Sequence, residues 1–212
     1  MNVPLLLVAG FAAGGVNAIA GGGSLITFPA LLAAGLPPVT ANVTNSVAVC
    51  PGYAASVVGT WPDLDRRLAV RLLPAAVLGA LVGCALLLTT PGKTFEAIVP
   101  FLVLAASLSL LVPQRKSGHA HPAVLRGMTF VLSVYGGYFG AALGVMLLAG
   151  LAAVLPLALR RVVAVKNALS LIIGIVTVGV FALWGPVRWD AVAILVPATL
   201  LGGYLGARLS RR

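Results

Sequence analysis

Apolar residues dominate this chain in long, nearly unbroken stretches that are separated by short polar or basic turns. A helix needs about 20 predominantly apolar residues to cross the roughly 30 Å hydrocarbon core of a bilayer. Stretches of that length predict membrane-spanning helices, and the chain contains five of them: 40–61, 68–88, 94–112, 162–184 and 189–209.

Two further apolar segments, 2–36 and 123–159, are too long for one straight helix and too short for two full crossings. Glycine interrupts each of them near its middle, at 20–24 in the first and at 142–144 in the second. A glycine inside a helix costs roughly 1 kcal/mol relative to alanine. We therefore expect each segment to form a pair of short helices that meet near mid-membrane or as a tight hairpin.

The composition supports a membrane protein. Hydrophobic residues make up 60% of the 212 residues and charged residues only 8%, and the mean hydropathy is +1.10. Soluble domains carry about 25% charged residues, so this chain lacks the polar side chains needed to cover a surface that faces water. We expect an all-α, multi-pass integral protein of the cell inner membrane.

The net charge of +10 has a topological interpretation. Most basic residues lie at the ends of apolar runs, where the positive-inside rule places them on the cytoplasmic side. No nucleic-acid-binding motif accompanies them, so a nucleic-acid partner is not expected. The rule predicts a cytoplasmic C-terminus and an external N-terminus.

The chain also contains an internal repeat. Asn45 recurs as Asn167, and Gly22 recurs as Gly144, at the same shift of 122 positions. One further inserted residue aligns more pairs: Trp61, Pro74, Gly79 and Gly83 with Trp184, Pro197, Gly202 and Gly206. We predict a first repeat at 1–90, a connecting transmembrane helix at 94–112, a polar linker at 113–122 and a second repeat at 123–212.

Equivalent loops of the two repeats carry opposite charge bias. The loop at 61–71 is basic, whereas its counterpart at 184–190 is nearly neutral; the loop at 36–40 is uncharged, whereas its counterpart at 159–163 is basic. The positive-inside rule then places the repeats upside-down relative to each other. An inverted-topology repeat with about seven to nine membrane segments, and a broken pair in each half, is typical of alternating-access carriers.

Side chains for catalysis are scarce in the apolar segments. Both histidines, His119 and His121, lie in the polar linker, and the four acids lie in loops or at helix ends. Gly23-Ser24 lacks the next glycine of a nucleophile elbow, and no Lys-Ser/Thr follows the glycine run as a P-loop requires. Cys50 and Cys84 have no metal or redox spacing. We expect neither an enzyme nor a bound metal or cofactor.

Polar residues concentrate at the two breaks, where unpaired N–H groups and the helix dipole favour an anion. Other roles stay open: the glycines could permit close packing, the asparagines could bridge helices, and Lys166 could extend to the interface. The candidate substrate-binding residues are Asn17, Gly21, Gly22, Gly23, Ser24, Thr44, Asn45, Ser46, Tyr135, Gly136, Gly137, Gly144, Lys166 and Asn167.

The stretches 14–31 and 41–46, with a weaker echo at 135–144, resemble the TauE/SafE sulfite-exporter family of membrane permeases. The resemblance implies two related halves and the movement of sulfite, organosulfonates or related small anions. We therefore expect a secondary transporter, in the export direction, that works by alternating access. The alternative is a non-transporting membrane scaffold or accessory subunit.

The expected partners are a small anionic substrate and the lipid bilayer. The sequence leaves open whether a proton or sodium ion is coupled to transport. It also leaves open whether the protein forms a homodimer, because a glycine-rich helix face packs equally well inside one chain or between two.

Overall fold

The computed structural model describes residues 2–19, 21–111 and 121–209. Their regular secondary structure is entirely helical, which confirms the all-α fold class. After the short 3₁₀ turn Trp61–Asp63, the chain resumes as an α-helix. The α-helices of the described part are α1 (Val3–Ile19), α2 (Ser24–Ala33), α3 (Pro38–Thr60), α4 (Arg66–Thr89), α5 (Gly92–Leu111), α6 (Pro122–Tyr138), α7 (Leu143–Val154), α8 (Leu159–Trp184) and α9 (Trp189–Leu209).

The five expected long helices correspond to α3, α4, α5, α8 and α9. Of these, α4, α8 and α9 (over Trp189–Gly206) combine the length and the hydropathy of a membrane span within the described residues. Helix α3 has the length but carries more polar residues, and most of these are buried inside the bundle. The proline at Pro38 occupies its first turn, where a missing N–H costs nothing.

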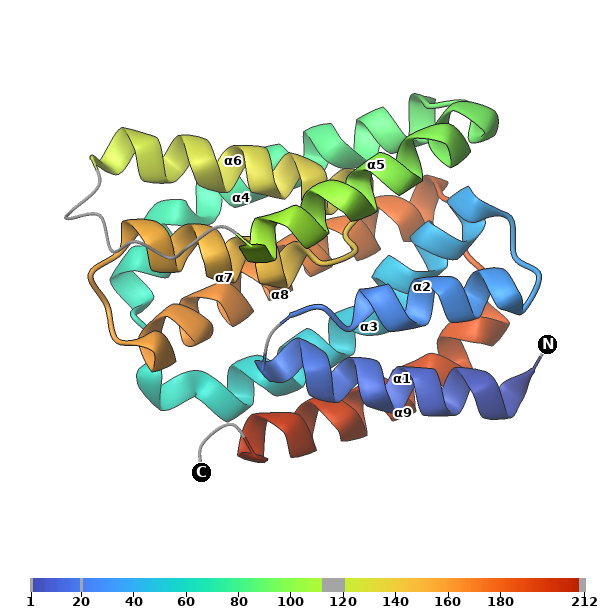
Figure 1. Ribbon diagram of the computed structural model, residues 1–212, viewed down its shortest axis with the longest axis horizontal. Helices are drawn as coiled ribbons and strands as arrows, with labels where there is room; N and C mark the ends of the chain where they lie inside the picture. Colours follow the sequence, from blue (N-terminus) through green and yellow to red (C-terminus); the bar gives the residue numbers. More distant parts are fainter. Residues whose placement is uncertain (1, 20, 112–120, 210–212) are drawn as a thin grey trace.

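Both broken segments form the expected pairs of shorter helices, α1–α2 and α6–α7 (Figure 1). The second break is displaced from the glycine that we used to place it. Phe139–Ala142 form the connection, because Gly140 and Ala142 take left-handed conformations with φ of 72° and 62°. Gly144 consequently lies in the first turn of α7, instead of in the break itself.

Equivalent helices of the two halves run in opposite directions. In Figure 1, α1, α3 and α9 run leftward, whereas α4, α6 and α8 run rightward. The contacts between helices are also equivalent in the two halves. Helix α1 packs along α9, and the equivalent α6 packs along α4. Helix α3 contacts α9, and the equivalent α8 contacts α4. Helices α3 and α8, which are equivalent, pack against each other at the centre. This arrangement confirms the inverted-topology repeat.

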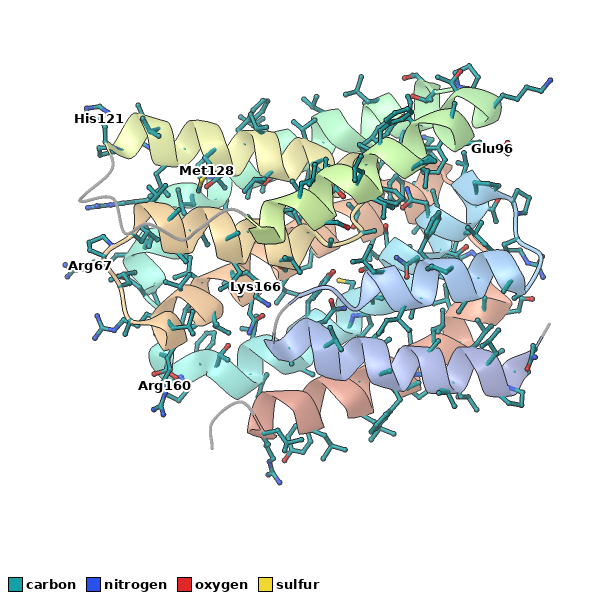
Figure 2. All side chains as sticks on the ribbon, viewed as in Figure 1. Arg67, Glu96, His121, Met128, Arg160 and Lys166 are labelled. Atoms are coloured by element: carbon teal, nitrogen blue, oxygen red, sulfur yellow. The ribbon has the colours of Figure 1, made fainter. Side chains whose placement is uncertain are left out.

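Basic side chains gather at one end of the bundle. Arg67, His121 and Arg160 lie at the left end in Figure 2, and Glu96 lies at the opposite end. The start of α1 and the end of α9 also lie at opposite ends (Figure 1). Of the expected basic clusters, the residues at 115–116 and 211–212 fall outside the described part. Arg67 and Arg160, from the basic loops at 61–71 and 159–163, share one end, as the charge pattern requires.

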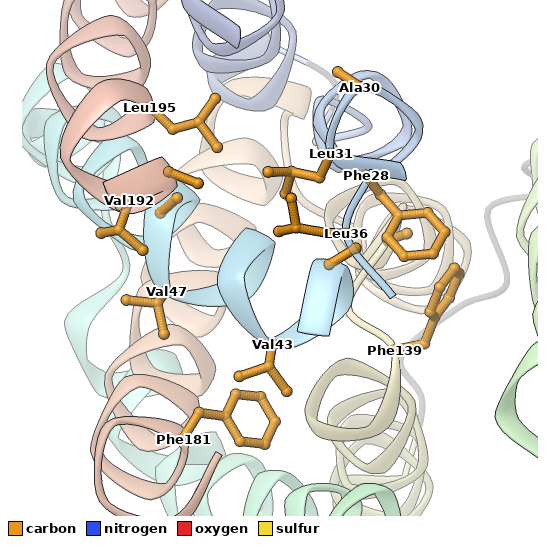
Figure 3. Close-up of a cluster of buried hydrophobic side chains, with 14 of the residues drawn as sticks. Phe28, Ala30, Leu31, Leu36, Val43, Val47, Phe139, Phe181, Val192 and Leu195 are labelled. Atoms are coloured by element: carbon orange, nitrogen blue, oxygen red, sulfur yellow. The ribbon is translucent and has the colours of Figure 1, made fainter. Parts of the chain in front are cut away.

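The apolar core consists of two main clusters. The first contains Phe28, Val43, Phe139 and Phe181 (Figure 3). Phe28 and Phe139 meet edge to face, with ring centroids 5.3 Å apart. The second contains residues of α4, α6, α7 and α8; its members include Leu72, Leu147, Val162 and Ile173.

Candidate functional site

A small cavity lies between the central helices α3 and α8, beside both breaks. Its volume is about 20 Å³, which is room for roughly one water molecule. A sulfur oxyanion is larger, so this conformation is closed. The lining residues are Ser24, Asn45, Ser46, Val49, Tyr53, Gly136, Gly140, Leu143, Ser170, Ile173, Gly174 and Thr177.

Most polar groups around the cavity are already hydrogen-bonded. The Thr27 hydroxyl donates to Oδ1 of Asn45, and the Ser46 hydroxyl donates to the Asn42 carbonyl at 3.0 Å. Ser170 differs, because its hydroxyl is buried and has no hydrogen-bond partner in the described structure. A buried hydroxyl without a partner is costly, so Ser170 is available to a bound molecule.

Asn17 organises the first break. Its Oδ1 accepts a hydrogen bond from the Gly23 amide at 2.8 Å, which fixes the connection between α1 and α2. Its Nδ2 is buried and, among the described residues, unpartnered. The side chain therefore has one structural contact and one spare donor.

Lys166 is buried in the middle of the bundle, with 1% of its surface exposed. Its ammonium group donates to the main-chain carbonyl of Asn17 at 3.0 Å, in the last turn of α1. The negative end of a helix dipole stabilises a cation there. Figure 2 shows Lys166 well inside the basic end marked by Arg67 and Arg160. The side chain thus turns inward instead of extending to the membrane interface.

No carboxylate accompanies this ammonium group. All four acids of the chain belong to the described part, and none is buried. Asp63 and Asp65 lie in the turn before α4. Glu96 lies in α5 just after its first turn, and Asp190 lies in the first turn of α9. The centre therefore contains a cation with only a carbonyl group to compensate it.

The glycines at the breaks allow two backbones to touch. A Cβ on Gly144 would lie 2.5 Å from the Cα of Gly21, which is closer than real Cβ atoms approach. Gly21 also has a φ of +88°, in the region that favours glycine. A Cβ on Gly23 would clash with the backbone of Ala13, and one on Gly22 would lie 3.2 Å from the Val145 side chain.

Four of the candidate residues hold helices together and do not line the cavity. Thr44 accepts a hydrogen bond from the Arg188 amide at 3.0 Å, and the Tyr135 hydroxyl donates to the Ala141 carbonyl at 2.7 Å. Asn167 donates to the Thr60 hydroxyl at 3.2 Å.

The fourth is Gly137. A Cβ there would meet the backbone of α4, 3.0 Å from the Cys84 nitrogen. Of the candidates, Ser24, Asn45, Ser46 and Gly136 line the cavity. Asn17, Gly23 and Lys166 are not among its lining residues and are joined to one another by hydrogen bonds through Asn17.

Several backbone donors at the breaks are also occupied. The amides of Leu25 and Ile26 donate to the carbonyls of Gly22 and Gly23, and those of Val145 and Met146 both donate to Ala142. In this closed conformation, the available donors are therefore mainly side chains: Lys166, Asn17 and Ser170.

Sequence reasoning left Ser170 and Thr177 out of the candidate set. Ser170 lies four positions after Lys166, and Thr177 a further seven, so all three share one face of α8. Polar residues that recur at helical spacing within an apolar helix are a signal visible in the sequence.

Comparison with known proteins agrees with this architecture. The family model described as Sulfite exporter TauE/SafE matches residues 6–212. A protein of Sinorhizobium sp. named Probable membrane transporter protein ORF9 is 30% identical, over 96% of this chain and 81% of its own. A Probable membrane transporter protein of Haemophilus influenzae is 29% identical, over 97% and 84%.

Probable membrane transporter protein YfcA of Escherichia coli K12 is 27% identical, over 93% of this chain and 76% of its own. No solved structure is a significant match. The family match and these relatives support a membrane transporter. With the family model covering nearly its whole length, the chain belongs to the TauE/SafE sulfite exporter family.

Proposed function

We propose that the protein is a secondary transporter that moves a small oxyanion, such as sulfite or an organosulfonate, across the cell inner membrane. The observation that carries this proposal is the buried ammonium group of Lys166, which lies between the two inverted halves without a carboxylate partner. An ionisable residue inside the membrane is costly, and such residues mark substrate and ion pathways.

The groups around the centre suit an anion better than a cation. Lys166, Nδ2 of Asn17 and the hydroxyl of Ser170 can all donate hydrogen bonds. The unpartnered amide oxygens in the described interior, those of Asn42 and Asn167, are neutral, and no described carboxylate is buried there to bind a cation. Charge-assisted hydrogen bonds from Lys166 would be the strongest that an oxyanion could gain here.

The closed cavity supports an alternating-access mechanism. Two apolar clusters fill much of the bundle interior, one around Phe28 and Phe139 and one around Leu72 and Leu147. Rocking of one repeat against the other would open one end at a time around a fixed central site. Since basic side chains face the cytoplasm in most membrane proteins, the basic end would collect the anion there for export.

Flux measurements on purified protein in liposomes test the proposal. We expect the wild type to release trapped sulfite or an alkanesulfonate faster than protein-free liposomes do. Asn45→Ala should slow release by about tenfold, because it removes the partner of Thr27 at the cavity wall. The control Ser107→Ala changes an exposed residue of α5 and should keep the wild-type rate. Equal rates for wild type, Asn45→Ala and protein-free liposomes would rule the proposal out.

A further inference from the structure

We propose that this transporter selects anions that carry a single negative charge, and that Lys166 sets this selectivity. The inference rests on the proposed function and concerns the same central site. It goes further by naming the charge of the substrate and the residue that selects for that charge.

The distribution of charge supports the proposal. Among the residues that the structure describes, Lys166 is the single charged side chain that is fully buried. The described arginines are exposed, and they lie toward the ends of the bundle with Lys93. In a medium of low dielectric constant, a charge that nearby groups do not compensate is costly. One ammonium group can balance one negative charge at this site, and a second would remain uncompensated.

The contact with Asn17 explains how the empty site tolerates the ammonium group. The carbonyl that accepts from Lys166 belongs to the last turn of α1, where the helix dipole provides a partial negative charge. A bound anion would take over this interaction by pairing with the ammonium group directly. Lys166 therefore has a partner in both the empty and the loaded carrier.

Neutral donors complete the head-group site without adding charge. Nδ2 of Asn17 and the hydroxyl of Ser170 are each buried and lack a hydrogen-bond partner within the described residues. Ser170 lines the cavity and lies one helical turn from Lys166 on the same face of α8. These donors can bind the remaining oxygen atoms of a head group, but they cannot balance a second full charge.

Part of the cavity lining is apolar. Val49, Leu143 and Ile173 contribute it, beside polar lining residues such as Ser24 and Ser46. An alkyl or hydrogen substituent on the sulfur centre fits against these apolar side chains better than a charged oxygen does. The substrate class is therefore an oxyanion of charge −1 with one uncharged substituent.

Paired flux measurements in one proteoliposome preparation test this inference. Methanesulfonate and sulfate are similar in size and carry one and two negative charges at neutral pH. We expect the wild type to move methanesulfonate at least about tenfold faster than sulfate, a difference of about 1.4 kcal/mol in transition-state free energy. Lys166→Arg should keep the preference, because it keeps the charge. Lys166→Met should lose methanesulfonate flux.

The control variant Lys93→Met removes an exposed lysine from the first turn of α5 and should leave both rates unchanged. Thermal unfolding establishes that each variant is folded. The ratio of methanesulfonate flux to sulfate flux in the wild type tests the inference without any variant. Equal wild-type flux of the two anions would overturn charge selection, as would a preference that persists in folded Lys166→Met. Absence of flux for any oxyanion, sulfite included, would overturn the proposed function and this inference with it.

Discussion

Gly21 and Gly144 lie backbone against backbone at the point where the two broken segments meet. A Cβ on Gly144 would lie 2.5 Å from the Cα of Gly21 and 2.8 Å from its carbonyl oxygen. The first residue belongs to the break between α1 and α2, and the second to the first turn of α7. The two halves of the repeat therefore touch through glycines, and side-chain volume at this contact would separate them.

Gly144→Ala should destabilise the protein, because the added methyl group has no space between the two backbones. Overpacking of this kind costs about 1–3 kcal/mol, and the midpoint of thermal unfolding in detergent should fall. Gly179→Ala is the matched control, since a Cβ there meets nothing within 4 Å. In α8, alanine should be neutral or slightly stabilising. An unfolding midpoint that is equal for both variants would contradict the contact.

Two equivalent helix pairs should respond alike to the same substitution. A Cβ on Gly79 would lie 2.5 Å from the Phe130 carbonyl in the α4–α6 pair, and one on the equivalent Gly202 would clash with the Phe11 carbonyl in the α1–α9 pair. We expect Gly79→Ala and Gly202→Ala to lower the unfolding midpoint by similar amounts, each about 1–3 kcal/mol in stability. Gly127→Ala has open space and serves as the control. A lower unfolding midpoint for the variant of only one helix pair would contradict equivalent packing in the two pairs.

Thr27→Val should be destabilising although it preserves shape. The substitution removes the hydroxyl that donates to Oδ1 of Asn45 and leaves a buried oxygen without a partner. That loss costs about 1–3 kcal/mol. The exposed Thr94→Val, measured in the same thermal unfolding series, should change little. Unchanged stability of Thr27→Val would mean that the hydrogen bond contributes nothing.

Thiol labelling of intact cells tests the proposed orientation. Arg188 lies between α8 and α9, whereas Arg161 lies in the first turn of α8 at the basic end. We expect Arg188→Cys to react with a membrane-impermeant maleimide from outside and Arg161→Cys to react only after permeabilisation. The natural Cys50 and Cys84 are buried, so background labelling should be low. The opposite labelling pattern would reverse the orientation.

Hydropathy alone predicted the helical architecture, because crossing the bilayer requires long apolar helices whatever their neighbours. The long helices begin and end within a few residues of the expected bounds; the largest difference is at the start of α8, at Leu159 instead of 162. The exact position of the second break was not predictable from glycine alone. It depends on left-handed residues at Gly140 and Ala142, and alanine rarely adopts that conformation without tertiary contacts.

The candidate site was predictable in outline and not in detail. Sequence reasoning left two roles open for Lys166, at the interface or inside the bundle, because either agrees with its place near the start of an apolar stretch. Lys166 lies inside the bundle because it donates a hydrogen bond to the carbonyl of Asn17, which is 149 positions away in the chain. The same distant packing places Asn167 against Thr60 and leaves Ser170 facing the cavity.

The central claim is that an anion crosses the membrane beside Lys166. The most direct test is the initial rate of sulfite release from liposomes that contain wild type, Lys166→Met or Lys93→Met at equal protein density. The account predicts that wild type and Lys93→Met release sulfite at equal rates, while Lys166→Met falls to the protein-free rate. Wild-type release by folded Lys166→Met would contradict the account.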